Sequence, residues 1–260
     1  MLVDVHAHLD HPDFKKDIDQ VIERAKKAGV VGIISNGVNP ESNKCVLALA
    51  KKYDIVHASF GLYPTDLLGF PDESGMPASE PIDLDKECEY FKKHKDLFIS
   101  IGEVGIDYKW DKHHHETQKK NFEKIMGLAE KTKKPLIVHS RKAEKDVIDL
   151  LESSSLKNVL LHCFMGNKKL IQRAADKQYS FSVPAIIVRL QHFQMLVEDV
   201  GIGQLLTETD SPWLTPFPEK RNEPQYVAET IKKIAEIKKL DRDEVEKNIF
   251  MNFQQRFLKK

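Results

Sequence analysis

Phe98-Ile99-Ser100-Ile101-Gly102-Glu103 is a short apolar run that ends in a carboxylate. Pro135-Leu136-Ile137-Val138-His139 has the same form, with an imidazole at its end. Short apolar runs rich in β-branched residues are typical of strands that are buried on both faces. Six further runs show a similar pattern, at residues 2–8, 30–35, 55–60, 159–162, 179–183 and 204–208. We therefore predict eight buried strands, several of which end in a polar, titratable group.

The segments between these runs are longer, rich in Lys and Glu, and amphipathic. Ile18, Val21, Ile22 and Ala25 show the apolar spacing of three and four residues that is typical of a helix. Strands that alternate with helices form either a closed barrel or a doubly wound open sheet. The count of eight favours the barrel, and the 260 residues match the roughly 250 of a typical TIM barrel. We predict one (β/α)8 domain over residues 1–260, with slight distortion allowed.

The composition limits the possible classes of protein. Hydrophobic residues make up 41% of the chain and charged residues 31%, which is enough for a large core beneath a polar surface. Lys plus Arg equals Asp plus Glu, at 40 each, so no overall positive charge attracts nucleic acid, although a local basic patch is not excluded. Three cysteines are too few for a disulfide framework. With no signal peptide and no long apolar span, we predict a cytoplasmic protein without membrane contact.

The longest irregular stretch lies between the third and fourth predicted strands, at residues 67–83. A loop of this length is usually a functional lid or a mobile segment, and a tolerated surface insertion is an equally good interpretation. Its glycines and prolines are Gly69, Pro71, Gly75, Pro77 and Pro81.

Titratable side chains lie at or near the C-terminal ends of five predicted strands, which is the active-site face of a TIM barrel. His6 and His8 are two residues apart on one strand, so their side chains point to the same face of the sheet. Each of these side chains alone is weak evidence for a metal site. Burying all of them without a shared partner, however, would cost much free energy. Imidazoles with carboxylates suit Zn, Mn or Fe, and four histidines make a pure Mg site less natural. The predicted metal ligands are His6, His8, Glu103, His139, His162 and Asp210.

The motifs resemble those of TatD-family metal-dependent deoxyribonucleases, which belong to the amidohydrolase-like barrel superfamily. The resemblance covers nearly the whole chain, and the motifs occur in the family's order. It implies two divalent metal ions (Mg, Mn or Zn) with Glu103 as their shared ligand, and hydrolysis of phosphodiester bonds in DNA. The matching segments are Asp4–His8, Gly102–Tyr108, Pro135–Arg141, His162–Phe164, Glu208–Pro212 and Arg221–Pro224.

One segment departs from the family pattern. The family commonly has Gly-x-His-Pro after the third strand, whereas this chain has Gly61-Leu62-Tyr63-Pro64. A histidine there would contact substrate phosphate or a group behind the metal ligands. Tyr63 can donate a hydrogen bond but carries no charge near neutral pH. We place Tyr63 among the predicted substrate-binding residues.

Further residues have predicted roles around the metal ligands. Arg141 follows His139 by two residues, and its guanidinium suits a phosphate oxygen, with a surface ion pair as the alternative. Arg221 is a weaker candidate of the same kind. Glu208 is expected to share a face with Asp210 and to hydrogen-bond a metal ligand, although a plain buried carboxylate is equally consistent. Cys163 is expected on the face opposite His162, among the helices, as an inert thiol.

The predicted function is a divalent-metal-dependent deoxyribonuclease that acts on single strands or ends by metal-activated water. Asp210 and Glu103 are the predicted catalytic residues, with Asp210 as both ligand and base. No obligate protein partner is implied. The first alternative is another amidohydrolase-type enzyme acting on an ester, lactone or amide, but many of these bridge their metals with a lysine. The second is a non-catalytic scaffold, but a structural zinc site is closed by four ligands and the chain offers six.

Overall fold

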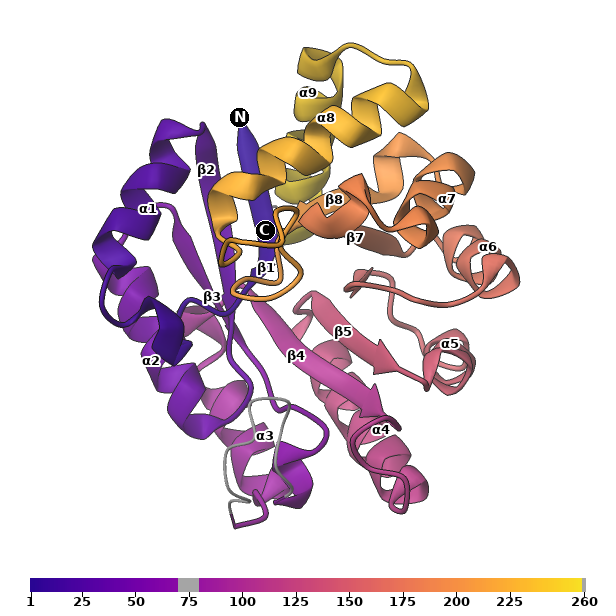
Figure 1. The fold of residues 1–260 in the computed structure, drawn as a ribbon. Coiled ribbons are helices and arrows are strands. Elements are labelled where there is room, and N and C mark those ends of the chain that lie inside the picture. Colours follow the sequence, from indigo (N-terminus) through magenta and orange to yellow (C-terminus); the bar gives the residue numbers. More distant parts are fainter. Residues whose placement is uncertain (70–79, 259–260) are drawn as a thin grey trace.

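The strands form a barrel whose order in space follows their order in the chain (Figure 1). The computed structural model describes residues 1–69 and 80–258. Neighbouring strands are parallel throughout. The strands are β1 (Leu2–Ala7), β2 (Val30–Asn36), β3 (Val56–Phe60), β4 (Ser100–Asp107), β5 (Leu136–Arg141), β6 (Val159–Leu161), β7 (Ser180–Pro184) and β8 (Leu205–Glu208).

The barrel closes between the ends of β1 and β8. Ala7 and Ser211 form a parallel bridge, the amide of Asp210 donates to the carbonyl of His6 at 2.8 Å, and the amide of His8 donates to the carbonyl of Ser211 at 2.9 Å. The predicted (β/α)8 fold is therefore confirmed. Closure also brings the first and last candidate metal ligands together, although more than 200 residues of chain separate them.

A helix follows each strand and lies on the outside of the barrel, as Figure 1 shows. α1 buries Val21, Ile22 and Ala25 against the strands, as their spacing predicts. Side chains of Asn39, Asp83 and other polar residues accept hydrogen bonds at helix starts. The helices are α1 (Ile18–Lys27), α2 (Pro40–Lys52), α3 (Leu84–Lys93), α4 (His115–Thr132), α5 (Glu144–Glu152), α6 (Lys168–Asp176), α7 (Gln191–Asp199), α8 (Val227–Lys238) and α9 (Arg242–Phe253).

The fourth strand is longer than the sequence indicates. β4 continues to Asp107, so the prediction that Glu103 ends this strand was wrong. The extension depends on Gly105, which has φ 150° and lies so close to β5 that a Cβ there would be 2.0 Å from the carbonyl oxygen of His139. Only glycine allows this approach. Glu103 therefore lies in the middle of a strand, and Asp107 takes the terminal position.

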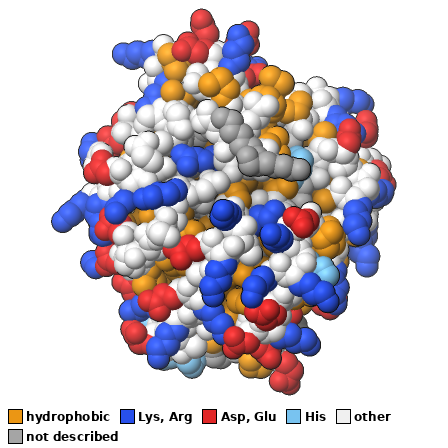
Figure 2. Space-filling view, turned by 180° about the vertical axis from the view of Figure 1, so that it is seen from behind, with side chains coloured by type: hydrophobic (Ala, Val, Ile, Leu, Met, Phe, Trp, Pro, Cys, Tyr) orange, Lys and Arg blue, Asp and Glu red, His pale blue; other side chains and the backbone are white. Residues whose placement is uncertain are grey.

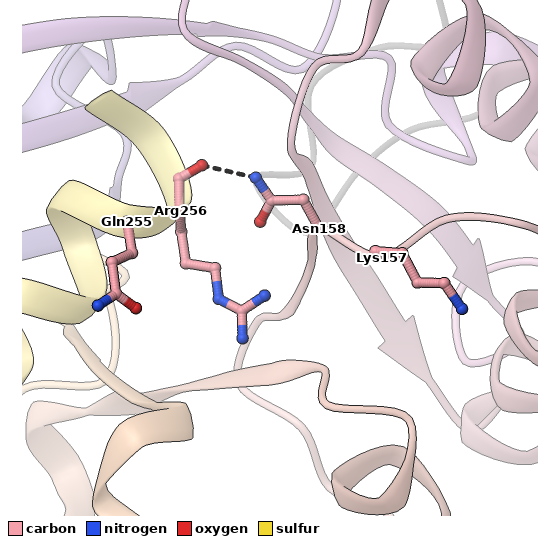
Figure 3. A pocket seen from close by; sticks show the side chains of 4 residues that line it. All are labelled: Lys157, Asn158, Gln255 and Arg256. Carbon is pink, nitrogen blue, oxygen red and sulfur yellow. Dashed lines mark hydrogen bonds between the residues drawn. The ribbon is translucent and has the colours of Figure 1, made fainter. Parts of the chain in front are cut away.

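The opposite end of the barrel is covered by the C-terminal segment. The side-chain amide of Asn252 donates to the carbonyls of Ile202 and Leu205, both at 2.8 Å, and holds α9 beneath β8. A cavity of about 520 Å³ opens here, and in it Asn158 Nδ2 donates to the carbonyl of Arg256 at 2.6 Å (Figure 3). It lies at the start of β6, on the far side of the barrel from the strand C-termini. It is therefore separate from the candidate metal centre.

The outer surface carries mixed charges. Figure 2 shows Lys and Arg side chains interspersed with Asp and Glu over one face, in line with the net charge of zero. Among the residues that the structure describes, no helix has both the length and the apolar character needed to span a bilayer. The loop predicted at residues 67–83 falls partly outside the described residues, since 70–79 are not included.

Candidate metal centre

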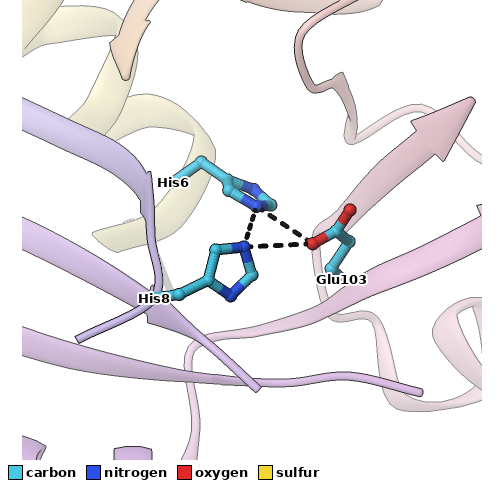
Figure 4. Close-up of side chains that lie close together, drawn as sticks. All are labelled: His6, His8 and Glu103. Atoms are coloured by element: carbon cyan, nitrogen blue, oxygen red, sulfur yellow. Dashed lines mark hydrogen bonds and ion pairs between the residues drawn. The ribbon is translucent and has the colours of Figure 1, made fainter. Parts of the chain in front are cut away.

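Four predicted ligands meet where the ends of β1 and β8 face the middle of β4. The Nε2 atoms of His6 and His8 lie 3.2 Å apart, and they lie 3.2 and 3.3 Å from Oε2 of Glu103 (Figure 4). Asp210 Oδ1 lies 3.7 Å from His6 Nε2 and 3.4 Å from His8 Nε2. We call His6, His8, Asp210 and the Oε2 atom of Glu103 the first ligand group.

The spacing of the first ligand group suits a single ion. Ligand atoms held tetrahedrally at about 2.0–2.1 Å from zinc lie about 3.3–3.4 Å from one another. The distances from the two histidine nitrogens to each other and to the two carboxylate oxygens run from 3.2 to 3.7 Å. Only Asp210 keeps appreciable exposure, with 16% of its side chain open to solvent against 4% for Glu103. A divalent ion would fit among these atoms, with its open side at Asp210.

The second ligand group consists of His139, His162 and the Oε1 atom of Glu103. His139 Nδ1 lies 2.7 Å and His162 Nε2 3.7 Å from this oxygen. One candidate ligand atom from each of the three residues lies within 4.8 Å of the other two. Glu103 therefore directs one carboxylate oxygen to each group. Such an arrangement would allow the carboxylate to be shared by two ions.

Three of the four imidazoles are held by a partner on their other ring nitrogen. His8 Nδ1 donates to the carbonyl of Asn36 at 3.1 Å, His139 Nε2 to Asp107 Oδ2 at 3.1 Å, and His162 Nδ1 to Glu208 Oε2 at 2.8 Å. Such bonds fix the tautomer and the ring orientation, so that the second nitrogen keeps its lone pair for a metal. His6 Nδ1 has no hydrogen-bond partner among the described residues.

The charges of the two groups favour a bound cation. Burial opposes ionisation of Glu103, but the charge of His6 and the hydrogen bond from His139 outweigh it and hold the pKa of Glu103 well below its ordinary range. Burial likewise opposes protonation of His139, yet hydrogen bonds to Asp107 and Glu103 raise the pKa of His139 to about 10. The carboxylates thus stay ionised and hold positive charge strongly. A divalent ion would replace these protons.

Asp107 has a role that the sequence prediction missed. Tyr63 donates its hydroxyl proton to Asp107 Oδ2 at 2.8 Å, and the same hydroxyl oxygen lies 3.2 Å from His139 Nε2. Tyr63 is only 8% exposed, so it contacts a group behind the ligands instead of the open mouth. A signal was present in the sequence, because residues 103 and 107 are four apart in one strand and share a face.

Replacing Asp107 with asparagine is expected to weaken one of two metal-binding steps about 10- to 100-fold, the usual cost of losing a partner behind a metal ligand. The other step should be unchanged, because the first ligand group contains no contact with Asp107. Calorimetric titration of metal-stripped protein with Zn or Mn measures both steps. Tyr63→Phe should shift the same step by less, and Asp149→Asn, on the partly exposed face of α5, should shift neither. Equal weakening of both steps would contradict this assignment.

The turn after β4 is held by Asp111 and Gln118. Gln118 accepts from the amide of Asp107 at 2.8 Å and donates to its carbonyl at 2.9 Å and to Asp111 Oδ2 at 3.0 Å. Asp111 Oδ1 also accepts from the amides of His113 and His114. Burial opposes ionisation of Asp111, but these hydrogen bonds outweigh it and hold its pKa at about 2.

This lowered pKa predicts a pH-dependent contribution to stability. A carboxyl whose pKa falls from 3.8 to about 2 on folding contributes about 2 kcal/mol, fully present above pH 5 and lost as the pH falls toward 2. Asp111→Asn should therefore lower the free energy of unfolding by about 2 kcal/mol at pH 7. Urea unfolding at pH 3–7 should show the difference constant above pH 5 and shrinking below pH 4. A difference that grows with acidity would exclude this cause.

Glu208 lies behind the second ligand group. It is fully buried, and besides His162 it accepts from the hydroxyl of Ser182 at 2.6 Å and the amide of Cys163 at 2.9 Å. Three donors compensate the burial of this carboxylate. The expected hydrogen bond from a predicted ligand to Glu208 is thus present in the structure.

Strand alternation does not determine the position of the Cys163 side chain. β6 ends at Leu161, and Cys163 has φ 43°, so the period of two stops before this residue. Its amide turns toward Glu208. Burial, followed by the negative charges of Glu208, Asp210 and Glu103, raises the pKa of the Cys163 thiol well above its ordinary range. The thiol is therefore protonated, and the strand alternation on which its predicted location among the helices depends does not extend to this residue.

The two predicted phosphate-binding arginines lie in different surroundings. Arg141 ends β5 at the mouth of the barrel, with its guanidinium carbon 5.8 Å from the centre of the Trp110 ring. Arg221 donates to Asp17 at 2.7 Å and to Glu223 at 2.9 Å. The structure therefore places Arg221 in an ion-pair network that ties the segment after β8 to α1, and does not bring it together with the ligand groups.

Comparison with known proteins identifies the family. Residues 3–258 match the family described as TatD related DNase. The metal-dependent hydrolase YabD of Bacillus subtilis is 32% identical over 251 residues, with 94% of each chain covered. Deoxyribonuclease TATDN3 of Homo sapiens is 33% identical, with 94% of this chain and 90% of that protein covered.

Similarity of structure agrees with these matches and with the motifs. The crystal structure of YJJV, a TatD homolog from Escherichia coli, superposes with a TM-score of 0.88 at 25% identity and covers 100% of this chain and 98% of its own. Its match extends over the strands that carry both ligand groups. The resemblance indicated by the sequence motifs is thereby confirmed, and the chain belongs to the TatD-related DNase family of metal-dependent hydrolases.

Proposed function

We propose that this hydrolase cleaves phosphodiester bonds in DNA, at single strands or ends, with two divalent ions held by the two ligand groups. The observation that carries the proposal is the position of Glu103, whose two oxygens lie against separate sets of histidines. Paired ions that share a ligand are typical of enzymes that hydrolyse phosphoesters. The named activity of human TATDN3 as a deoxyribonuclease supports DNA as the substrate.

The donor atoms fit the ions that the proposal requires. Imidazole nitrogens with carboxylate oxygens suit Zn and Mn, and the share of carboxylates also accommodates Mg. Such ions polarise a phosphate oxygen and make water a stronger acid. A structural site would be closed by its protein ligands, whereas the first ligand group is open at Asp210. The arrangement therefore supports catalysis better than a purely structural role.

The residues of the chain have separate tasks in this proposal. Asp210 is the base that accepts a proton from water. Burial opposes its ionisation, but the hydrogen bond from His8 and the charges of His162 and His6 lower its pKa, so it is a carboxylate at neutral pH. Arg141 binds a phosphate oxygen at the mouth. Tyr63 acts through Asp107 and His139, while Arg221 remains a predicted substrate contact that its ion pairs do not favour.

The test is cleavage of end-labelled single-stranded DNA by metal-stripped protein after Mg, Mn or Zn is added back. We expect cleavage only with added metal, and two ions per chain by elemental analysis. Single-stranded and frayed substrates should be cut faster than blunt duplex. No cleavage with any metal, while two ions are bound, would exclude the nuclease and redirect the search to lactones and cyclic amides. Binding of a single ion would exclude the shared role of Glu103.

A further inference from the structure

Two exposed tryptophans stand at the mouth of the barrel, and the chain contains no others. Trp213 is 37% exposed and Trp110 is 42% exposed. Trp213 follows β8, and Trp110 follows β4. In a barrel of eight strands in sequential order, these two strands are diametrically opposed. The two indoles therefore lie on opposite sides of the ligand groups.

Each tryptophan is anchored by its backbone to a residue of the metal centre. The amide of Trp213 donates to the carbonyl of Asp210 at 3.0 Å, and the amide of Trp110 donates to Asp107 Oδ1 at 3.0 Å. The fully buried Asn222 fixes Trp213 further, since its side-chain amide donates to the Trp213 carbonyl at 2.5 Å and to the Thr209 carbonyl at 2.7 Å. The backbone that carries Trp213 is thus bonded to a predicted ligand, and the backbone that carries Trp110 is bonded to Asp107, the partner of His139.

The surroundings of the rings suit a nucleic acid strand. The Trp213 ring lies edge to face with His8, with 5.3 Å between the ring centres, so it stands next to the first ligand group. Over the Trp110 ring, the ammonium of Lys109 lies 5.4 Å and the guanidinium carbon of Arg141 lies 5.8 Å from the ring centre. Exposed aromatic faces next to cations are how proteins bind unpaired bases and their phosphates.

We propose that Trp213 and Trp110 are stacking platforms for two unstacked nucleobases, one on each side of the phosphodiester held at the metal centre. This inference rests on the proposed function and adds the part of the substrate that is recognised. It requires both bases to be free of pairing, which a single strand or a frayed end provides. It also predicts that strands of any base sequence bind similarly, because every base has a π face.

Intrinsic fluorescence tests the platforms without requiring cleavage. Trp110→Phe leaves Trp213 as the sole tryptophan, and Trp213→Phe leaves Trp110, and excitation is confined to the red edge of the absorption band so that the tyrosines do not contribute. Each metal-loaded variant is titrated with a phosphorothioate-linked single-stranded tetranucleotide, which resists hydrolysis, and with the same backbone lacking bases. We expect the emission to change with the base-bearing strand in both variants and not with the abasic one. Equal responses to both strands, or none, would overturn the proposal.

Kinetics provide the second test. Trp213→Ala and Trp110→Ala should each lower kcat/KM for a base-bearing strand, relative to the abasic strand, by roughly tenfold or more. Trp213→Phe should restore most of the loss, and Tyr90→Ala, which removes an exposed aromatic on α3, should not change the ratio. If neither strand is cleaved, the proposed nuclease activity is excluded, and the fluorescence titration still tests whether the tryptophans stack on bases. If the alanine variants cleave DNA efficiently and the ratio of kcat/KM between the base-bearing and abasic strands is unchanged, the stacking role of the tryptophans is excluded and the nuclease activity stands.

Discussion

Glu103→Ala is expected to abolish binding of both metal ions and to lower turnover by about a thousandfold or more. Glu103 is the only described residue with an oxygen in each ligand group. Each ion contributes several kcal/mol of charge stabilisation in a phosphoryl transition state, and about 1.4 kcal/mol corresponds to a tenfold change in rate. Elemental analysis after dialysis and cleavage of labelled DNA measure the two losses.

Glu103→Gln sharpens this prediction. The amide keeps one acceptor oxygen and turns its NH₂ donors toward the other group, so at most one ion per chain should remain. Glu130→Ala, on the outer face of α4, should retain both ions and full activity. Thermal unfolding of each metal-stripped variant checks that the barrel is intact. Two tightly bound ions in the alanine variant would show that Glu103 is not shared.

Asp210→Asn is expected to lower kcat by about a hundred- to ten-thousandfold, which is the usual contribution of a positioned general base. The amide cannot accept a proton from water, but it can still bind at the first ligand group through its oxygen. The substitution is well matched to the backbone, because Asp210 has φ 55° and asparagine tolerates the left-handed region better than most residues. With alanine at this position, backbone strain at φ 55° and loss of the general base would both lower kcat and could not be separated.

The measurement is kcat at saturating metal, so that weakened ion binding does not contribute. The pH profile provides a further check. The acid limb of the wild-type profile, where Asp210 would take up a proton, should be absent from the residual activity of the variant. Unchanged turnover at saturating metal would exclude Asp210 as the base and leave it as a ligand alone.

Much of the fold was readable because strand burial and helix amphipathicity are local properties. Eight apolar runs predict eight strands, and the structure contains all eight, with the bounds of seven of them close to the prediction. The exception, β4, shows where the local signal is insufficient. Gly105 looks like an interruption in the sequence, yet it permits the contact with His139 that lets the strand continue to Asp107.

The ligand types were also readable, because histidines and carboxylates are costly to bury without a partner. Which of these side chains contact one another was not readable from the sequence. His6 and Glu103 are 97 residues apart, and Tyr63 and His139 are 76 apart, so only closure of the barrel decides that they meet. Arg141 and Arg221 look alike in the sequence, but the structure binds Arg221 to Asp17 and Glu223 and places Arg141 at the end of β5, at the mouth of the barrel.

The sequence by itself thus determined the barrel, the face on which the chemistry is placed and the chemical nature of the ligands, because periodicity and residue type carry that information. The tertiary structure alone decided which oxygen of Glu103 faces which ligand group, which partner orients each histidine, and which aromatic ring lies beside His8. These depend on distances of a few ångströms between side chains remote in the chain, and such distances are set by how the strands close into a barrel.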